Sequence, residues 1–295
     1  MIYNLCMIEM STEKGLTKEC LKKWVLEANY EVLPTAKALV LVEAIPQSNR
    51  VSVTCRPTGI EDTVSFVEAL GRERAGRVTP HLAAGRVLNE AHLEDVTKRL
   101  LEMGTKRALV VGGDGEPFGS EFTKAEDVLR WFNKKGVAFE RIGVGGYPDG
   151  NPTFKLDPTE VLLRKQVLAE EMQTDMEVLT QMCFDVDTIL NWVREIREKG
   201  VSLPVVVGIP GQLKPKTVVM VLKLLGVHDV WSFFKSKPKL AMTMAKATLG
   251  GFSPDEMLRE LAEKNEPSLG IRGISIYTIG NITGSVKVLS DLVEG

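Results

Sequence analysis

Residues 108–147 read ALVVGGDGEPFGSEFTKAEDVLRWFNKKGVAFERIGVGGY and contain the clearest pattern of secondary structure in the chain. An apolar run ends in Gly-Gly-Asp, helical periodicity follows over Ala125–Lys135, and a second apolar run begins at Ile142. Apolar runs without polar alternation are typical of strands buried on both faces of a parallel sheet. The stretch therefore predicts one βαβ unit with parallel strands.

The same alternation extends along the chain in both directions. Apolar runs predict strands at Leu5–Met10, Ala38–Ile45, Arg77–Ala83, Ala108–Gly113, Ile142–Tyr147, Glu177–Phe184, Pro204–Ile209 and Gly273–Ile279. Helical periodicity separates them at Leu21–Leu33, Thr63–Arg74, Leu93–Met103, Ala125–Lys135, Val161–Met172 and Thr188–Lys199. About eight such repeats favour a closed (β/α)8 TIM barrel over a doubly wound open sheet. We expect one barrel domain over residues 1–295, with a long helical connection at about 211–272.

Two strand-like runs near the N-terminus lie too close together for both to be barrel strands. Ala38–Ile45 and Arg50–Cys55 are separated only by Pro46–Asn49, whereas parallel neighbours need a crossover of about a dozen residues. We therefore expect Leu5–Met10 to be the first strand and Ala38–Ile45 the second. Arg50–Arg56 is then an extended loop or a small hairpin.

Composition excludes several classes of protein. The net charge is −2 without a basic stripe, so nucleic acid is not an expected partner. The first ten residues lack a basic region, and Glu9 interrupts their apolar run, so we expect no signal peptide, no membrane span and a cytoplasmic location. The four cysteines are scattered and the three histidines have no HxxxH spacing, which predicts reduced cysteines and no metal site.

Polar residues follow several predicted strands, where the active site of a TIM barrel lies. The motifs are Thr79-Pro80-His81-Leu82, Gly113-Asp114, Tyr147-Pro148-Asp149-Gly150-Asn151-Pro152, Thr180-Gln181-Met182-Cys183-Phe184-Asp185, Val207-Gly208-Ile209 and Ile276-Tyr277-Thr278. In order and spacing this set resembles the motifs of the methylenetetrahydrofolate reductase family, from roughly Arg77 to the C-terminus. That family has a (β/α)8 barrel and, usually with FAD, moves a hydride between NAD(P)H and 5,10-methylenetetrahydrofolate to give 5-methyltetrahydrofolate.

The resemblance implies roles for individual residues. Asp114 matches an aspartate beside the flavin and the pterin, where its charge stabilises the iminium cation that accepts the hydride. Gln181 matches a glutamine that hydrogen-bonds the pterin, which suits an amide that both donates and accepts. The implied cofactor side comprises His81, Gly113, Asp114, Tyr147, Asn151 and Lys165, and the implied substrate side comprises Gln181, Phe184 and Tyr277. The plain alternatives are a turn aspartate, a buried glutamine and ordinary barrel packing.

The family also has a glutamate at the end of strand one, which acts as general acid and opens the folate five-membered ring. Glu9 occupies that place if Leu5–Met10 is the first strand, and burial in its apolar run would raise its pKa towards a useful range. The family normally has Pro-Pro soon after this glutamate, whereas Met10-Ser11-Thr12 follows here. Glu43, which precedes Ala44-Ile45-Pro46, is the reserve candidate.

Three replacements bear on the cofactor. Gly112 stands where the family generally has an arginine, Asn151 replaces a histidine, and Gln166 replaces a lysine, although Lys165 is adjacent. FAD with NAD(P)H as co-substrate is therefore one hypothesis, and direct transfer of hydride from nicotinamide to folate is another. A third is a folate-binding barrel without flavin that transfers a methyl group or supports a partner protein of one-carbon metabolism. The direction of the reaction and a homo-oligomeric state are left open.

Overall fold

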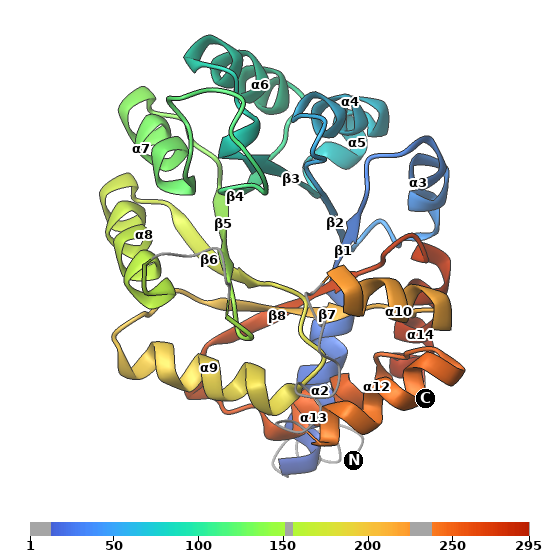
Figure 1. The fold of residues 1–295 in the computed structure, drawn as a ribbon. Helices are drawn as coiled ribbons and strands as arrows, with labels where there is room; N and C mark the ends of the chain where they lie inside the picture. Colours follow the sequence, from blue (N-terminus) through green and yellow to red (C-terminus); the bar gives the residue numbers. More distant parts are fainter. Residues whose placement is uncertain (1–12, 151–155, 225–237, 295) are drawn as a thin grey trace, which may run out of the picture.

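A computed structural model describes residues 13–150, 156–224 and 238–294. Eight parallel strands form a closed barrel in chain order, which confirms the predicted (β/α)8 fold (Figure 1). The strands are β1 (Asn29–Val32), β2 (Arg50–Val53), β3 (Val78–Ala83), β4 (Arg107–Val111), β5 (Arg141–Gly146), β6 (Asp175–Thr180), β7 (Val205–Pro210) and β8 (Ile271–Tyr277). Pairing of β1 with β8 closes the barrel.

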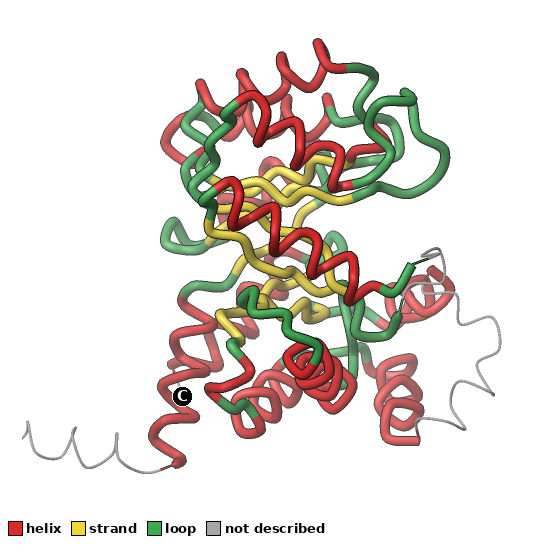
Figure 2. The backbone as a smooth tube through the Cα atoms, turned by 90° about the vertical axis from the view of Figure 1, so that its left-hand side faces the viewer, coloured by secondary structure: helices red, strands yellow, loops and turns green. Residues whose placement is uncertain are grey.

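Helices surround this barrel, as Figure 2 shows from the side. They are α2 (Glu13–Leu26), α3 (Ala36–Leu41), α4 (Glu61–Leu70), α5 (Arg72–Ala75), α6 (Glu90–Glu102), α7 (Ala125–Lys135), α8 (Pro158–Met172), α9 (Val186–Glu198), α10 (Pro215–Leu224), α12 (Pro238–Gly250), α13 (Asp255–Lys264) and α14 (Ile282–Glu294). Short 3₁₀ turns lie at η1 (Val42–Ala44), η2 (Ala84–Arg86) and η3 (Pro267–Leu269). The expected connection between β7 and β8 contains α10, α12 and α13.

Helix α7 shows how the sequence sets a local element. The Asp127 carboxylate accepts from the backbone N–H of Thr123 and of Lys124, which satisfies donors at the helix start. The helix ends at Gly136, whose left-handed conformation (φ 65°) suits a residue without a Cβ. Val128, Leu129 and Phe132 form its fully buried face, at the three- and four-residue spacing of a helix packed on a sheet.

Strand residues alternate between the surrounding helices and the barrel interior. Val110, Val144 and Val178 are fully buried in the large outer core, whereas the residues on either side of them face inward. Leu109, Leu179 and Val206 form a separate small apolar cluster inside the barrel. This apolar layer divides the interior into a hollow at the C-terminal ends of the strands and another at their N-terminal ends.

The predicted order of the first two strands is wrong. Ala38–Ile45 forms α3 and η1 instead of a strand, and Arg50–Arg56 contains β2 instead of a loop. The helix expected over Leu21–Leu33 ends at Leu26, and β1 begins at Asn29. Leu5–Met10 lies outside the described residues, and the barrel closes without it. Residues 33–49, with α3, supply the crossover that two parallel strands require.

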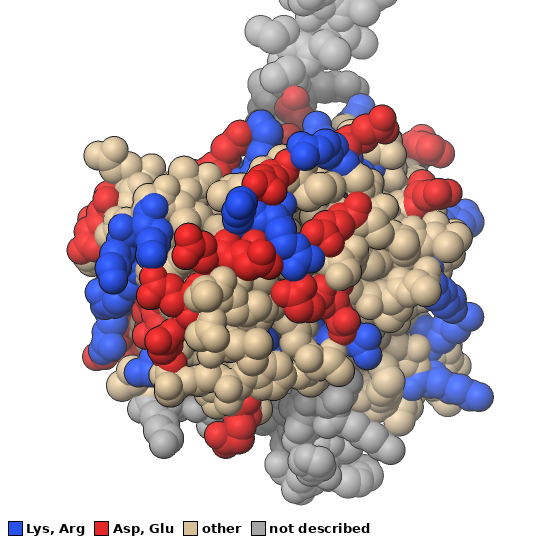
Figure 3. All heavy atoms as spheres, turned by 90° about the horizontal axis from the view of Figure 1, so that it is seen from above, with Lys and Arg blue, Asp and Glu red and all other residues tan. Residues whose placement is uncertain are grey.

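The surface that Figure 3 presents carries acidic and basic side chains side by side. This mixture agrees with the nearly balanced charge of the sequence, at 37 basic and 39 acidic residues. Among the described residues, no helix is both long enough and apolar enough to cross a membrane. The same part of the chain contains no cluster of three or more histidine, cysteine or acidic side chains that could hold a metal ion.

Candidate active site

A hollow with about 1150 Å³ of open space lies at the C-terminal ends of the strands. We call it the C-terminal hollow. It is lined by His81, Gly113, Asp114, Tyr147, Gln181 and Tyr277, all of which the sequence indicated as site residues. Strands β3, β4, β5, β6 and β8 bring them together, because parallel strands end at the same mouth of the barrel.

Glu31 is the glutamate that the structure adds to this hollow. It lies one residue before the end of β1, in register with Tyr277 of β8. The hydroxyl of Thr278 donates to the Glu31 carbonyl at 2.7 Å, which fixes the backbone there. Of the two glutamates considered from the sequence, Glu43 is exposed on η1 and does not line the hollow, and Glu9 lies outside the described residues.

Burial shifts the titration of Glu31 and His81 in opposite directions. The Glu31 side chain is only 14% exposed, and burial raises its pKa to about 8. Burial lowers the pKa of His81 to about 3. His81 Nε2 lies 3.8 Å from Glu31 Oε2 and 2.6 Å from Ser52 Oγ, so the imidazole is held by the serine while it faces the carboxyl. At pH 7 both groups are neutral, and Glu31 retains a proton.

The peptide between Thr180 and Gln181 is hydrogen-bonded at both its carbonyl and its N–H group. The Tyr277 hydroxyl donates to the Thr180 carbonyl at 3.0 Å, and burial raises the pKa of Tyr277 well above its usual value. The Gln181 backbone N–H donates to the Gly146 carbonyl at 2.7 Å. The Gln181 side chain is exposed in the hollow, and none of the described residues hydrogen-bonds its amide. A bound molecule therefore meets an amide that can both donate and accept.

The loop after β4 presents Asp114 at the rim of the hollow. Gly113 has φ 88°, and a Cβ there would meet the Ala83 Cβ at 3.1 Å, so this turn favours glycine. Arg86 anchors the loop by donating to the carbonyls of Asp114 and Glu116, while its guanidinium lies over the Phe118 ring. The Asp114 side chain itself is exposed.

Two of the other residues expected to bind cofactor or substrate, Lys165 and Phe184, do not line the C-terminal hollow. Lys165 is 4% exposed and lines a small hollow behind Tyr147, and burial lowers its pKa. Phe184 packs edge-on against Phe252, with ring centroids 5.2 Å apart, beside α12 and α13. Asn151 lies outside the described residues.

The C-terminal hollow has space for a planar ring system, but the cations that the described residues place around it do not fit the diphosphate of FAD. Arg56 pairs with Asp62 at 3.3 Å, Arg86 donates to backbone carbonyls, and Lys165 is buried away from the hollow. A diphosphate needs accessible cations or free backbone donors. Within the described ranges, none of these three side chains is an accessible, uncommitted cation, so we derive no step through a flavin.

The order of these strand-end residues has a counterpart among known proteins. The chain matches the family model described as Methylenetetrahydrofolate reductase over residues 35–226. The chain belongs to the methylenetetrahydrofolate reductase family. The matched range includes β2 to β7 and begins four residues after Glu31.

Three relatives within the methylenetetrahydrofolate reductase family show the degree of divergence. Methylenetetrahydrofolate reductase 1 of Schizosaccharomyces pombe is 30% identical over 162 residues, which are 52% of this chain and 26% of the relative. Methylenetetrahydrofolate reductase 2 of Saccharomyces cerevisiae is 27% identical over 125 residues, 40% of this chain and 20% of the relative. A probable methylenetetrahydrofolate reductase (NADPH) of Caenorhabditis elegans is 28% identical over 127 residues, 41% and 19% respectively. The matches thus span about a quarter or less of each relative's length.

The sequence did not indicate Glu31 as a site residue, because it falls near the end of the helix predicted over Leu21–Leu33. The available signal is Pro34, three residues later, since methylenetetrahydrofolate reductases normally have prolines soon after their strand-one glutamate. β1 has only four residues, and two of them, Asn29 and Glu31, are polar and line the barrel interior. Such a strand lacks the apolar run by which the other strands were predicted.

Proposed function

We propose that this chain transfers a hydride from a reduced nicotinamide cofactor to 5,10-methylenetetrahydrofolate, giving 5-methyltetrahydrofolate. The observation that carries the proposal is the buried carboxyl of Glu31 in the same hollow as Asp114 and Gln181, where burial raises its pKa to about 8. Family membership supports the substrate class. The proposal replaces Glu9 with Glu31 as the acid.

Glu31 is the proposed proton donor. Opening the folate five-membered ring requires a proton on a weakly basic nitrogen, and a carboxylic acid with a pKa of about 8 still carries that proton at pH 7. His81 faces the carboxyl at 3.8 Å and is neutral, so it does not stabilise the ionised form beforehand. Glu31 therefore stays protonated until a substrate nitrogen accepts the proton.

Asp114 and Gln181 are proposed to act on the folate. The open-ring iminium is cationic, and the charge of Asp114 at the rim favours it over the neutral substrate. The free amide of Gln181 suits the donor and acceptor edge of a pterin. Tyr147 and Tyr277 supply aromatic walls at the ends of β5 and β8.

Two routes for the hydride follow from different observations. Membership of a family that usually uses FAD makes a flavin relay the alternative route, although the described cations do not fit the diphosphate of FAD. The engagement of Arg56, Arg86 and Lys165 elsewhere supports direct transfer from nicotinamide to folate. In both routes Glu31 gives the proton and Asp114 stabilises the cation.

Purified full-length protein tests the proposal. Oxidation of NADH or NADPH only when methylenetetrahydrofolate is present, with 5-methyltetrahydrofolate as product, supports the reaction. Yellow protein with a flavin absorbance band indicates the relay, and colourless active protein indicates direct transfer. Protein that binds folate but gives no product with either nicotinamide, with or without added FAD, would overturn the proposed activity.

A further inference from the structure

A second hollow lies at the opposite mouth of the barrel, among the N-terminal ends of the strands. We call it the N-terminal hollow. Its polar lining is Asn29, Arg50, Ser52, Thr79, Arg107, Arg141 and Glu177. Its open space of about 390 Å³ is roughly a third of that of the C-terminal hollow. Leu109 and Leu179 line both hollows from opposite sides, so an apolar layer separates this place from the proposed chemistry.

Two of the cations at this mouth are neutralised by acids. Arg141 pairs with Asp175 at 2.5 Å and approaches Glu177 at 3.7 Å. Arg272 pairs with the same two carboxylates, at 3.0 Å and 3.1 Å respectively. These two arginines and two carboxylates form a closed network with no net charge.

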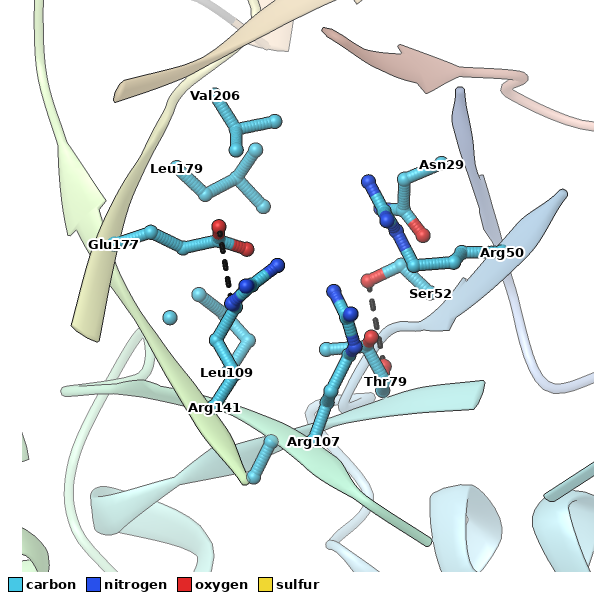
Figure 4. A pocket seen from close by; sticks show the side chains of 12 residues that line it. Asn29, Arg50, Ser52, Thr79, Arg107, Leu109, Arg141, Glu177, Leu179 and Val206 are labelled. Carbon is cyan, nitrogen blue, oxygen red and sulfur yellow. Dashed lines mark hydrogen bonds and ion pairs between the residues drawn. The ribbon is translucent and has the colours of Figure 1, made fainter. Parts of the chain in front are cut away.

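Arg50 and Arg107 have no such partners. Among the described residues, neither guanidinium group has a hydrogen-bond or ion-pair partner, and both residues are partly buried. Figure 4 shows their guanidinium groups, with that of Arg141, pointing into the hollow. Burial is the main cause that lowers the pKa of both arginines, that of Arg107 to about 10. Repulsion from Arg141 also lowers both pKa values, whereas attraction to Glu177 opposes part of the shift. Two guanidinium groups without a direct ion pair thus face one hollow, where Glu177 compensates their charge only in part, so an added anion would stabilise both.

Asn29 adds an unpartnered polar atom to the same space. Its side chain is 7% exposed, its Nδ2 lies 2.8 Å from Ser275 Oγ, and its Oδ1 is buried without a partner among the described residues. The two ends of an amide exchange by a flip, and the serine hydroxyl can donate as well as accept. Turning the amide would bring the NH₂ group to the place where Figure 4 shows the Asn29 oxygen, as a donor beside the two guanidinium groups.

We propose that the N-terminal hollow is a binding site for a small divalent oxyanion of the phosphate or sulfate type, held by Arg50, Arg107 and Asn29. Two cations match a charge of −2, and guanidinium and amide N–H groups are the donors that tetrahedral oxyanions accept. The small size of the hollow favours a free anion over the phosphate end of a larger molecule. The site is independent of the proposed folate reaction.

Thermal unfolding of the full chain tests this site with inorganic phosphate as the probe, against chloride at matched ionic strength. We expect the Tm of the wild type to rise with phosphate concentration and to saturate. Arg107→Gln and Arg50→Gln each remove one charge-assisted contact and should weaken the apparent phosphate affinity at least about tenfold. Arg77→Gln is the matched control, because Arg77 is an exposed arginine that does not line the hollow. Its phosphate response should stay within about twofold of the wild type.

Three outcomes would overturn the site. One is a wild-type Tm that does not respond to phosphate beyond the chloride control. Another is an equal weakening by Arg77→Gln, which would indicate only a general positive field. The third is a loss of Tm in Arg107→Gln and Arg50→Gln that is the same in chloride as in phosphate, which would make the arginines structural. In chloride we expect Arg107→Gln to be as stable as the wild type or more stable, since it removes a charge that is compensated only in part. Repeating the titration with glycerol phosphate distinguishes the sources of the anion, because a free-anion site responds to phosphate alone.

Discussion

Glu31 Oε2 lies 3.8 Å from His81 Nε2, yet the two side chains do not form an ion pair at neutral pH. Burial raises the pKa of the carboxyl to about 8 and lowers that of the imidazole to about 3. The proton of the pair therefore stays on Glu31, which lines the C-terminal hollow.

Turnover should fall as the pH rises through about 8, because the proposed acid must be protonated to act. Measuring kcat for methylenetetrahydrofolate reduction between pH 6 and 10 checks this expectation. A profile that is flat across that range, or that rises above pH 8, would contradict the role of Glu31.

Glu31→Gln keeps the shape of the side chain but removes its titrating proton. We expect methylenetetrahydrofolate reduction to fall by on the order of 10²-fold or more, in the range of general acid catalysis. Glu43→Gln is the matched control, since Glu43 is exposed outside the hollow and should be dispensable. Loss of turnover in the control but not in Glu31→Gln would reverse the assignment. Near-normal turnover in both variants would contradict the proposed mechanism.

The same variant should change how stability depends on pH. Glu31 titrates near 8 in the folded state and near 4.5 when unfolded, so the folded state holds the extra proton between these values. Its contribution to the free energy of unfolding is full below pH 4.5 and is lost as the pH rises to 8, on the order of 5 kcal/mol in total. Relative to the wild type, Glu31→Gln should therefore gain stability from pH 5 to pH 8.5. Denaturant unfolding at both pH values measures this gain. An equal difference in the free energy of unfolding between variant and wild type at pH 5 and pH 8.5 would contradict the raised pKa of Glu31.

Asp114→Asn should lower kcat more than it raises the Kd for folate. The carboxylate is proposed to stabilise a cation that forms after the substrate binds, so its charge counts most during turnover. Binding titrations with folate and steady-state kinetics separate the two effects. Unchanged kcat with weaker binding alone would make Asp114 a binding residue only.

Gly113→Ala should destabilise the fold more than Gly104→Ala does. Both glycines have φ 88°, so each substitution carries the left-handed strain of about 1–2 kcal/mol. Only at Gly113 does the added Cβ also meet a neighbour, Ala83 Cβ at 3.1 Å, whereas nothing lies within 4 Å at Gly104. Denaturant unfolding of the two variants measures the difference. Equal losses would show that the loop after β4 relaxes freely.

Local sequence was sufficient for the later strands. β3 to β8 lie within the predicted runs or overlap them closely, because strands covered on both faces must be almost wholly apolar. At the N-terminus, however, the local sequence predicted the wrong strands. The sequence AKALVL of α3 resembles a buried strand, whereas β1 is short and carries two polar residues. Hydrophobic periodicity indicates which residues are buried, but a short buried helix and a buried strand both give a short apolar run.

Local sequence was enough to predict the fold class and the strand ends at which His81, Asp114, Tyr147, Gln181 and Tyr277 lie, since polar residues that end apolar runs need no partners to be recognised. Which glutamate joins them depends on contacts between distant parts of the chain. β1 pairs with β8 from the other end of the chain, and that register places Glu31 beside Tyr277. The same closure brings Arg50 and Arg107 to one hollow. The pKa of Glu31 is raised because residues distant in the sequence desolvate its carboxyl, so the shift depends on the closed barrel.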